Sequence, residues 1–230
     1  MTIRTLEQLD DYLSEEIIWR KKELSILRSI IESEKPQKDK QNVLIRSGIT
    51  VLYAHWEGFI KSASSAYLEF VAMKRLPYSD LTANFIALCI KSKLKTALKS
   101  NKASVYAKIA EFFLTGISKK SKIPFKKSID TKSNLSSKLF KEIVYTLNLD
   151  YSCYILKEKL IDKKLLKSRN EIAHGQYLFM NVGDYMELFN EIIILIGTFR
   201  NQIINSACTE AYCRSSITSN IEKKDITKGK

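Results

Sequence analysis

The stretch LIRSGITVLYAHWEGFIKSASSAYLEFV, residues 44–71, decides the fold class of this 230-residue chain. Its apolar residues recur three, four or seven positions apart, which is the spacing of one face of an α-helix. That face consists of Leu44, Ile45, Ile49, Leu52, Trp56, Phe59, Ala63, Ala66 and Phe70. The pattern predicts one long helix over about 40–75, which ends at the sequence LPYSD, residues 76–80.

The same kind of spacing continues on both sides of this helix. We expect further helices over about 4–32, 81–100, 103–114, 135–147, 163–173 and 184–213. Residues 117–134 have no apolar period, include six lysines and one proline, and are predicted to form a loop. Only 7 Gly and 3 Pro interrupt the chain, which favours long helices with few connections. The sequence therefore predicts an all-α, up-and-down helical bundle in one domain, residues 1–213, followed by a flexible polar tail, residues 214–230.

Positive charge is concentrated in one segment of the chain. The net charge is +13, and residues 91–141 alone contain 14 lysines, no arginine and two acidic residues, a net charge of +12. We interpret this segment as a basic helical and loop insertion in the bundle. A surface of this kind is typical of polyanion binding. The alternative is a lysine-rich segment that is merely solvated.

Cofactor, membrane and export signals are missing from the sequence. The four cysteines form no CxxC pair and the two histidines supply no zinc-site spacing, so we predict no metal and no other cofactor. The N-terminal sequence is acidic and amphipathic, unlike a signal peptide, and no apolar run reaches the roughly 18 residues of a membrane span. We therefore expect a cytoplasmic protein with reduced thiols and no membrane association.

A second informative stretch is LLKSRNEIAHGQY, residues 165–177. Asp162 is a plausible N-cap for the helix predicted over 163–173, and Gly175 lies just past its end. On that helix Arg169 falls at the centre of an apolar arc, and Asn170 and His174 fall on its flank. The arc is formed by Leu165, Leu166, Ile172 and Ala173. A guanidinium in such a position must be paired or must bind an anion.

Two interpretations of this arginine follow. In the structural one, Arg169 pairs with a carboxylate from another helix, and His174 binds a free carbonyl at the helix end. In the functional one, Arg169 faces a cleft and holds a phosphate, while His174 donates or accepts a proton. Spacing alone leaves both open, because an arginine and a histidine five residues apart also occur by chance.

The other histidine, His55, lies within the apolar arc of the helix predicted over 40–75. Three small residues lie beside it and would let another helix approach closely: Gly48, Ser62 and Ala66. We expect a hydrogen-bonded packing histidine, with a supporting role next to Arg169 as the alternative. Trp56 is expected in the core, whereas Glu57 and Arg46 lie on the polar face and are expected at the surface or at an interface.

Three motifs resemble a known family. RNEIAHG, residues 169–175, is similar to the R-N-x-x-A-H-G form of the Arg-x4–6-His motif of HEPN (higher eukaryotes and prokaryotes nucleotide-binding) domains. WRKKEL, residues 19–24, and YAHWEGF, residues 53–59, precede it, and this order resembles the MAE-type HEPN nuclease family of bacteria. The resemblance covers about residues 3–75 and 158–205, and the basic middle segment contains no motif that we recognise.

The resemblance implies a small helical bundle that pairs as a homodimer, with two motifs meeting in one cleft. Many HEPN proteins are metal-independent endoribonucleases of toxin–antitoxin, abortive-infection or other anti-phage systems. By motif match, Arg169 and His174 are implied to be catalytic and Asn170 to be a supporting polar neighbour. The alternative is a non-catalytic HEPN module that binds RNA or nucleotide, or that dimerises with a larger effector. A DNA-binding repressor is less favoured, because no short helix-turn-helix with a basic recognition face is present.

The chemistry of RNA cleavage agrees with these residue types. Cleavage through the 2′-OH needs a base, an acid and a cation on the phosphate, and one Arg and one His from each of two subunits supply them. The expected partners are an RNA substrate, a second copy of the chain, and a cognate antitoxin or defence-system protein. The basic loop supplies the residues that we expect to bind RNA: Lys119, Lys120, Lys122, Lys126 and Lys127.

Overall fold

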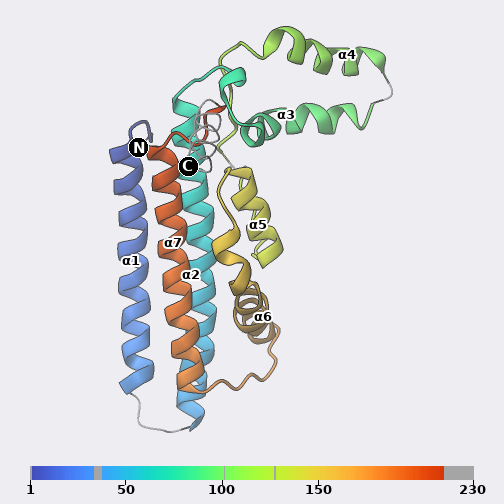
Figure 1. The fold of residues 1–230 in the computed structure, drawn as a ribbon. Helices are drawn as coiled ribbons and strands as arrows, with labels where there is room; N and C mark the ends of the chain where they lie inside the picture. Colours follow the sequence, from blue (N-terminus) through green and yellow to red (C-terminus); the bar gives the residue numbers. More distant parts are fainter. Residues whose placement is uncertain (1, 34–37, 101, 127, 215–230) are drawn as a thin grey trace, which may run out of the picture.

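The computed structural model describes residues 2–33, 38–100, 102–126 and 128–214. Over these residues the fold is helical, with loops, turns and two isolated β-bridges between the helices, which confirms the all-α prediction. Three long helices lie side by side: α1 (Leu6–Ser33), α2 (Lys38–Met73) and α7 (Val182–Cys208) (Figure 1). Their bounds lie within a few residues of those predicted from the apolar spacing.

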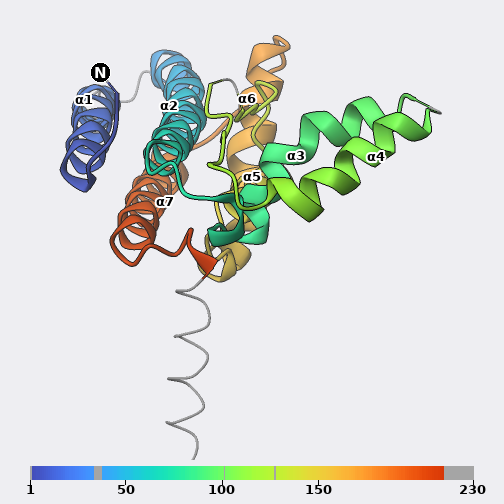
Figure 2. The same ribbon diagram turned by 90° about the horizontal axis from the view of Figure 1, so that it is seen from above.

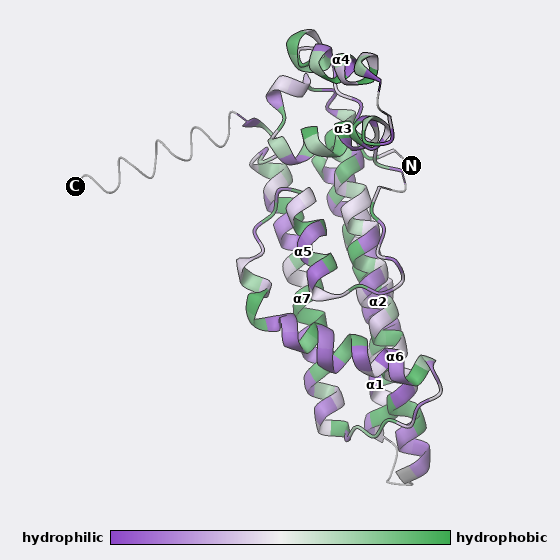
Figure 3. Ribbon diagram, turned by 90° about the vertical axis from the view of Figure 1, so that its right-hand side faces the viewer, coloured by the Kyte–Doolittle hydropathy of each residue, from purple (hydrophilic) through white to green (hydrophobic). Residues whose placement is uncertain are grey.

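Helix α2 is the central element of this bundle. Of its predicted apolar face, every residue except the half-buried Leu44 is buried. Other α2 residues outside that face, including Tyr53 and Ile60, are buried as well, because α1, α7 and the second layer of helices cover α2 from several sides. Figure 3 shows hydrophobic and hydrophilic residues interspersed along the helices of the bundle that face the viewer.

The close approach of α2 and α7 depends on Gly48. A Cβ atom at this position would lie 2.7 Å from Tyr185 Oη and 2.9 Å from the Tyr185 ring. A larger side chain would therefore have to displace a buried tyrosine of α7. The other two small residues of the predicted seam, Ser62 and Ala66, line a groove on the α1 side of α2.

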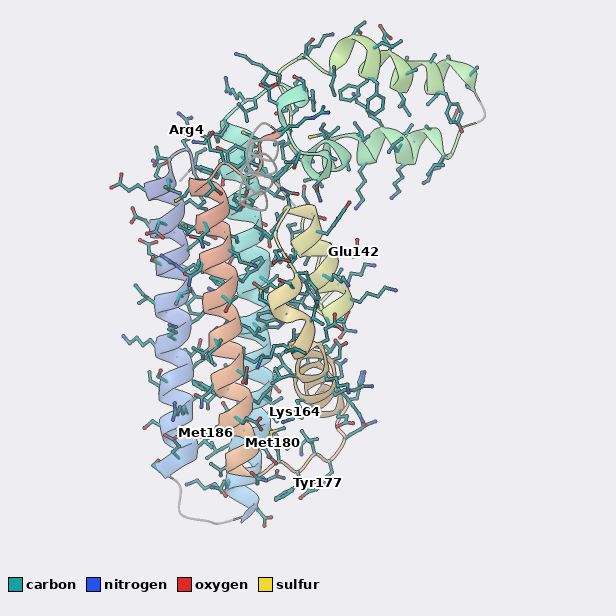
Figure 4. The ribbon with its side chains drawn as sticks, in the orientation of Figure 1. Arg4, Glu142, Lys164, Tyr177, Met180 and Met186 are labelled. Carbon is teal, nitrogen blue, oxygen red and sulfur yellow. The ribbon has the colours of Figure 1, made fainter. Side chains whose placement is uncertain are left out.

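A second layer packs on one side of the three long helices (Figure 1). It contains α5 (Ser137–Thr146), the 3-10 segment η3 (Ser152–Lys157), the π-helical segment η4 (Leu160–Leu166) and α6 (Lys167–Ala173). Phe140 of α5 anchors this layer, with its ring centroid 5.0 Å from that of Trp56, 4.8 Å from Tyr154 and 5.6 Å from Phe199. In η4 of the same layer, Nζ of Lys164 (labelled in Figure 4) lies 3.1 Å from Glu187 Oε2 of α7.

The predicted start of the helix over 163–173 is wrong. The helical path begins earlier and passes through η4 directly into α6, so Asp162 lies inside it and caps nothing there. The Asp162 carboxylate instead accepts hydrogen bonds from Ser137 N (2.7 Å) and Ser137 Oγ (2.6 Å) at the start of α5. A capping residue is recognisable from sequence, but the helix that it caps is set by tertiary packing.

A helical hairpin of α3 (Ala83–Ala97) and α4 (Ala103–Glu111) projects from one end of the bundle (Figures 1 and 2). Helix α4 continues into a π-helical turn, η2 (Phe112–Gly116), and the described residues of 117–134 form the non-helical loop that was predicted. The hairpin and this loop contain most of the basic segment. The predicted flexible tail, residues 214–230, lies outside the described residues apart from Arg214.

Candidate functional site

Helix α6 directs Arg169 against the middle of α2. The guanidinium carbon lies 4.1 Å from the centroid of the Tyr53 ring. Arg169 Nη1 donates a hydrogen bond to Asn170 Oδ1 and Nη2 donates one to the Ser133 carbonyl, both at 2.7 Å. The carboxylate of Glu57 lies 3.8 Å from Nη2, and the Arg169 side chain remains 20% exposed. The arginine is therefore held from four directions and keeps one edge open to solvent.

The position of Glu57 corrects the sequence prediction. Its side chain is only 13% exposed, and it accepts a hydrogen bond from Thr131 while it faces Arg169. Burial, reinforced by the neighbouring Glu57 carboxylate, raises the pKa of Tyr53 well above its ordinary value. Tyr53 and Glu57 both belong to the motif YAHWEGF, so this motif was the sequence signal that could have assigned them to the site. The helical periodicity alone placed Glu57 on the polar face because it could not show which helix would cover that face.

A short stretch at the end of the long loop bonds to residues of both α2 and α6 at the site. Asn170 Nδ2 donates a hydrogen bond to Asn134 Oδ1 at 3.1 Å, and Leu135 N donates one to Tyr53 Oη at 2.6 Å. Together with the Ser133 carbonyl, these contacts fix the loop to both α2 and α6. No pattern in the sequence indicated that this loop contributes to the site.

His174 ends α6 and its side chain is exposed to solvent. Gly175 follows with φ = 73°, the left-handed conformation that favours glycine after a helix. Arg46 Nη2 then donates a hydrogen bond to the Gln176 carbonyl at 3.1 Å, which fixes the chain beyond the turn. Within the described part of the chain the imidazole has no hydrogen-bond partner, so the carbonyl contact expected of a purely structural histidine is not made there. The backbone on either side of the exposed imidazole is therefore held in one conformation.

Each of the two interpretations of this motif therefore matches one of its two side chains. Arg169 has the carboxylate partner that the structural interpretation requires, because Glu57 of α2 faces it. His174, five residues later, has the free imidazole that the functional interpretation requires. Both side chains, with Asn170 between them, come from the same short helix.

His55 lies on the other side of α2 from Glu57, since residues two positions apart on a helix point in nearly opposite directions. It is buried at 5% exposure, and its Nε2 lies 2.9 Å from Glu23 Oε2 of α1. The Trp19 ring packs edge-on against it, with the centroids 5.1 Å apart. Its described contacts thus come from the WRKKEL motif of α1 rather than from Arg169.

We expect acid to destabilise the fold through His55. Burial, with Arg20 nearby, lowers the pKa of His55 below its ordinary value near 6.5, although the Glu23 carboxylate acts in the opposite direction. The unfolded chain therefore binds this proton more readily than the folded protein does, and stability falls as the pH drops through this range. Chemical denaturation of the wild-type protein and of His55→Gln, measured from about pH 7.5 to about pH 5.5, checks this. Parallel pH profiles for the two proteins would contradict it.

The structure does not bring the predicted RNA-binding lysines together as one group. Lys119, Lys120 and Lys122 line one groove at the base of the α3–α4 hairpin. Lys126 lines a different groove, whose lining includes three acidic residues: Asp11, Glu15 and Glu69. Lys127 lies outside the described residues. The loop therefore turns its basic side chains toward two different surfaces.

The described residues contain no group of three or more His, Cys, Asp or Glu side chains arranged to hold a metal ion. Within the described part of the chain, none of the four cysteines forms a disulfide. Across the described part of the chain, every helix is too short or too polar to span a membrane.

Comparison with known proteins gives one match. The family model described as MAE_28990-like HEPN aligns with residues 9–212 and so includes the three sequence motifs. No match was found among the curated proteins or among the solved structures. The matched region covers most of the chain and contains both the bundle and the Arg169–His174 site. The chain belongs to the MAE-type HEPN family.

Proposed function

We propose that this HEPN protein is a metal-independent endoribonuclease in which Arg169 and His174 are the catalytic residues. The observation that supports it is the contrast between the two side chains. Arg169 is half-buried and held by Tyr53, Asn170, Ser133 and Glu57, whereas His174 at the end of the same helix is exposed and unpartnered among the described residues. A fixed cation and a free imidazole on one short helix suit phosphoryl transfer.

The proposed reaction uses the RNA's own 2′-OH. A base removes the 2′-OH proton, O2′ attacks the adjacent phosphorus, and the bond from phosphorus to O5′ breaks. An acid then protonates O5′, which leaves a 2′,3′-cyclic phosphate and a 5′-hydroxyl. Arg169 stabilises the negative charge that gathers on the non-bridging oxygens. Since one imidazole cannot be base and acid at the same moment, a second copy of the chain supplies the other.

Chelation should leave this activity intact. Purified protein incubated in EDTA with a labelled RNA is expected to cleave it and to give products that end in a 2′,3′-cyclic phosphate or its hydrolysis product. An oligonucleotide with 2′-deoxy sugars should resist cleavage, because it lacks the attacking hydroxyl. A strict requirement for Mg²⁺ or Mn²⁺, or cleavage of the 2′-deoxy substrate, would rule out this mechanism.

A twofold dimer that brings two α6 helices together completes the site in this proposal. Large apolar and aromatic side chains are exposed near α6: Val43 of α2 is 61% exposed, and on the connection to α7 Tyr177 (labelled in Figure 4) is 76% exposed and Phe179 67%. Light scattering is expected to give twice the mass of the chain, and a Val43→Glu, Tyr177→Glu variant is expected to be monomeric and inactive. A monomer that cleaves RNA at the wild-type rate would contradict this.

The alternative is a non-catalytic HEPN module, and one observation favours it: the contacts of Arg169 with Glu57, Asn170 and Ser133 are those of a structural arginine. A structural arginine predicts that Arg169→Ala lowers stability in a protein that does not cleave RNA. For the nuclease we propose a toxin or anti-phage role, with a cognate antitoxin or defence protein as partner. Induced expression should then arrest cell growth with the wild-type protein but not with His174→Ala.

A further inference from the structure

The base of the α3–α4 hairpin contains a groove of about 420 Å³ that is lined by lysines from three segments of the chain. We name it the hairpin groove. Lys93 comes from α3, Lys108 from α4, and Lys119, Lys120 and Lys122 from the loop that follows η2. All five are exposed, and Glu111 is the one acidic residue in the lining. Residues up to 29 positions apart in sequence thus converge on one basic depression.

The backbone that carries the three loop lysines is fixed to the segment that follows α2, residues 76–78. Tyr78 N donates a hydrogen bond to the Lys119 carbonyl at 3.2 Å, and Ser121 N donates one to the Leu76 carbonyl at 2.8 Å. Lys122 N donates a third to Tyr78 Oη at 3.1 Å. The lysines are therefore presented from a held strand-like segment and not from a freely moving loop, which lowers the entropy lost when a ligand binds.

The wall of the hairpin groove is aromatic and closely packed. The Phe112 ring packs edge-on against Tyr78, with centroids 5.0 Å apart, and Lys93 Nζ lies 4.5 Å from the Phe112 centroid. A Cβ atom on Gly116 would lie 3.0 Å from Phe112 Cδ2, so the π-helical turn η2 leaves space for the ring. The packing holds α3, α4 and the loop in one arrangement, and thereby keeps the five ammonium groups around the same depression.

The charges in this groove suit a polyanion. None of the five lysines forms an ion pair within the described part of the chain, and the lining of the groove that holds Lys126, by contrast, includes three acidic residues. Lysine is a compact point charge, and its contacts with phosphates carry no information about base sequence. Five such groups against one carboxylate therefore favour the sugar–phosphate backbone of a nucleic acid strand, with little dependence on sequence.

The hairpin groove is well separated from Arg169. Tyr53, which contacts Arg169, and Met73, the last residue of α2, are 20 residues apart in the same helix. At about 1.5 Å of rise per residue this corresponds to roughly 30 Å. Figure 1 likewise shows the hairpin at one end of the bundle and α6 well below it. At about 3.4 Å per nucleotide of a stacked strand, the separation spans roughly nine nucleotides.

We propose that the hairpin groove is an RNA-docking site that binds the backbone of a strand roughly nine nucleotides from the bond at the Arg169–His174 site. The identity of the polyanion as RNA rests on the proposed nuclease function, whereas the polyanion binding rests on the groove itself. Docking at this distance would select long RNAs over short ones and would leave the choice of the cleaved bond to the site on α6.

Binding is measured in the His174→Ala protein, so that cleavage does not interfere, with a fluorescent single-stranded RNA of about 20 nucleotides over a series of salt concentrations. The groove variant replaces Lys93, Lys108, Lys119, Lys120 and Lys122 with glutamine. The matched control replaces Lys91, Lys95, Lys99, Lys102 and Lys138 of the same basic segment, which removes the same charge from surfaces outside the groove.

The groove variant is expected to bind about tenfold more weakly or worse, and its slope of log affinity against log salt should fall by about 0.7 for each phosphate that the protein no longer neutralises. The control should retain most of the affinity and slope, and Glu111→Gln should tighten binding.

Equal losses of affinity in the two five-lysine variants would overturn the proposal, as would an unchanged salt slope in the groove variant. Preferential binding of poly-glutamate over RNA at these lysines would overturn it in favour of an acidic protein partner. If the groove variant fails to fold, as judged by circular dichroism, the smaller variant Lys119→Gln, Lys122→Gln replaces it.

The result is separable from that of the nuclease proposal. If no RNA is cleaved but the groove variant alone loses binding, the nuclease function fails and the docking site stands. If RNA is cleaved, the groove variant should raise KM by a larger factor for the long RNA than for a tetranucleotide. Equal factors for both substrates would overturn docking while the nuclease function stands.

Discussion

Replacement of His174 by alanine is expected to lower the rate of RNA cleavage by about 10²–10⁴-fold, the usual effect of losing a general acid–base group. Thermal unfolding should hardly change, because the imidazole is exposed and has no hydrogen-bond partner among the described residues. Single-turnover cleavage of a labelled RNA, with protein in excess, measures the chemical step directly. Near wild-type cleavage by this variant would show that the site is assigned wrongly.

Arg169→Ala should abolish cleavage as well, but with a different signature. Its removal leaves the partly buried Glu57 carboxylate without its cation and the Ser133 carbonyl without its donor, so a loss of about 1–3 kcal/mol of stability accompanies the loss of activity. Lys167→Ala is the matched control. It removes a cation two residues away on α6, where Lys167 is 64% exposed and 3.6 Å from Glu171, and it should keep both activity and stability. Loss of cleavage in the control would mean that overall charge, not Arg169, carries the effect.

Trp56→Ala is expected to lower the free energy of unfolding by about 3–5 kcal/mol, the range for deleting a large buried aromatic side chain. The Trp56 side chain is fully buried and packs edge-on against Phe140, the residue that joins the second layer to α2 and α7. The cavity would therefore open at the junction on which α5 and, after it, α6 depend. Urea denaturation followed by circular dichroism measures the change, and cleavage activity should be lost at temperatures where the variant still retains helix.

Two controls separate packing from other effects in this experiment. Trp56→Phe keeps most of the volume, and since the indole N–H has no partner among the described residues, it should cost far less than alanine. Trp19, the other tryptophan, is 46% exposed, so Trp19→Ala should also be milder. Equal destabilisation by Trp56→Ala and Trp19→Ala would contradict the central place of Trp56 in the core.

The core was predictable from the sequence because it depends on local spacing. The three-and-four pattern over residues 44–71 correctly identified the helix, the burial of Trp56 and the close contact at Gly48. The turn at Gly175 was predictable for the same reason, since a glycine after a helix end acts through its own backbone. The motif RNEIAHG, in turn, indicated a family that the comparison then confirmed.

Features that depend on distant pairings were not predictable in this way. Glu57 faces Arg169 across 112 positions of sequence, and only tertiary packing makes the polar side of α2 an interior surface. Asp162 has the chemistry of a cap, yet its partner is Ser137 of another helix. The lysines of the loop have identical side chains, and their spacing in the sequence does not show that Lys119 and Lys126 line different grooves, because the path of the folded loop decides this.

The π-helical segment η4, just before α6, determines what a change in the length of the gene would do to the site. In a π-helix each backbone hydrogen bond joins residues five positions apart, and each turn therefore holds about one residue more than an α-helical turn. Loss of a single codon between Leu160 and Leu166 would remove that extra residue, and the segment would close into ordinary α-helix with the residues on either side still facing as they do now. Arg169 would then stay against Tyr53 and Glu57, and the cost would fall on the segment itself, where Ile161, Leu165 and Leu166 are buried. The length of this segment could thus change by one residue in a lineage while the residues of the site keep their places.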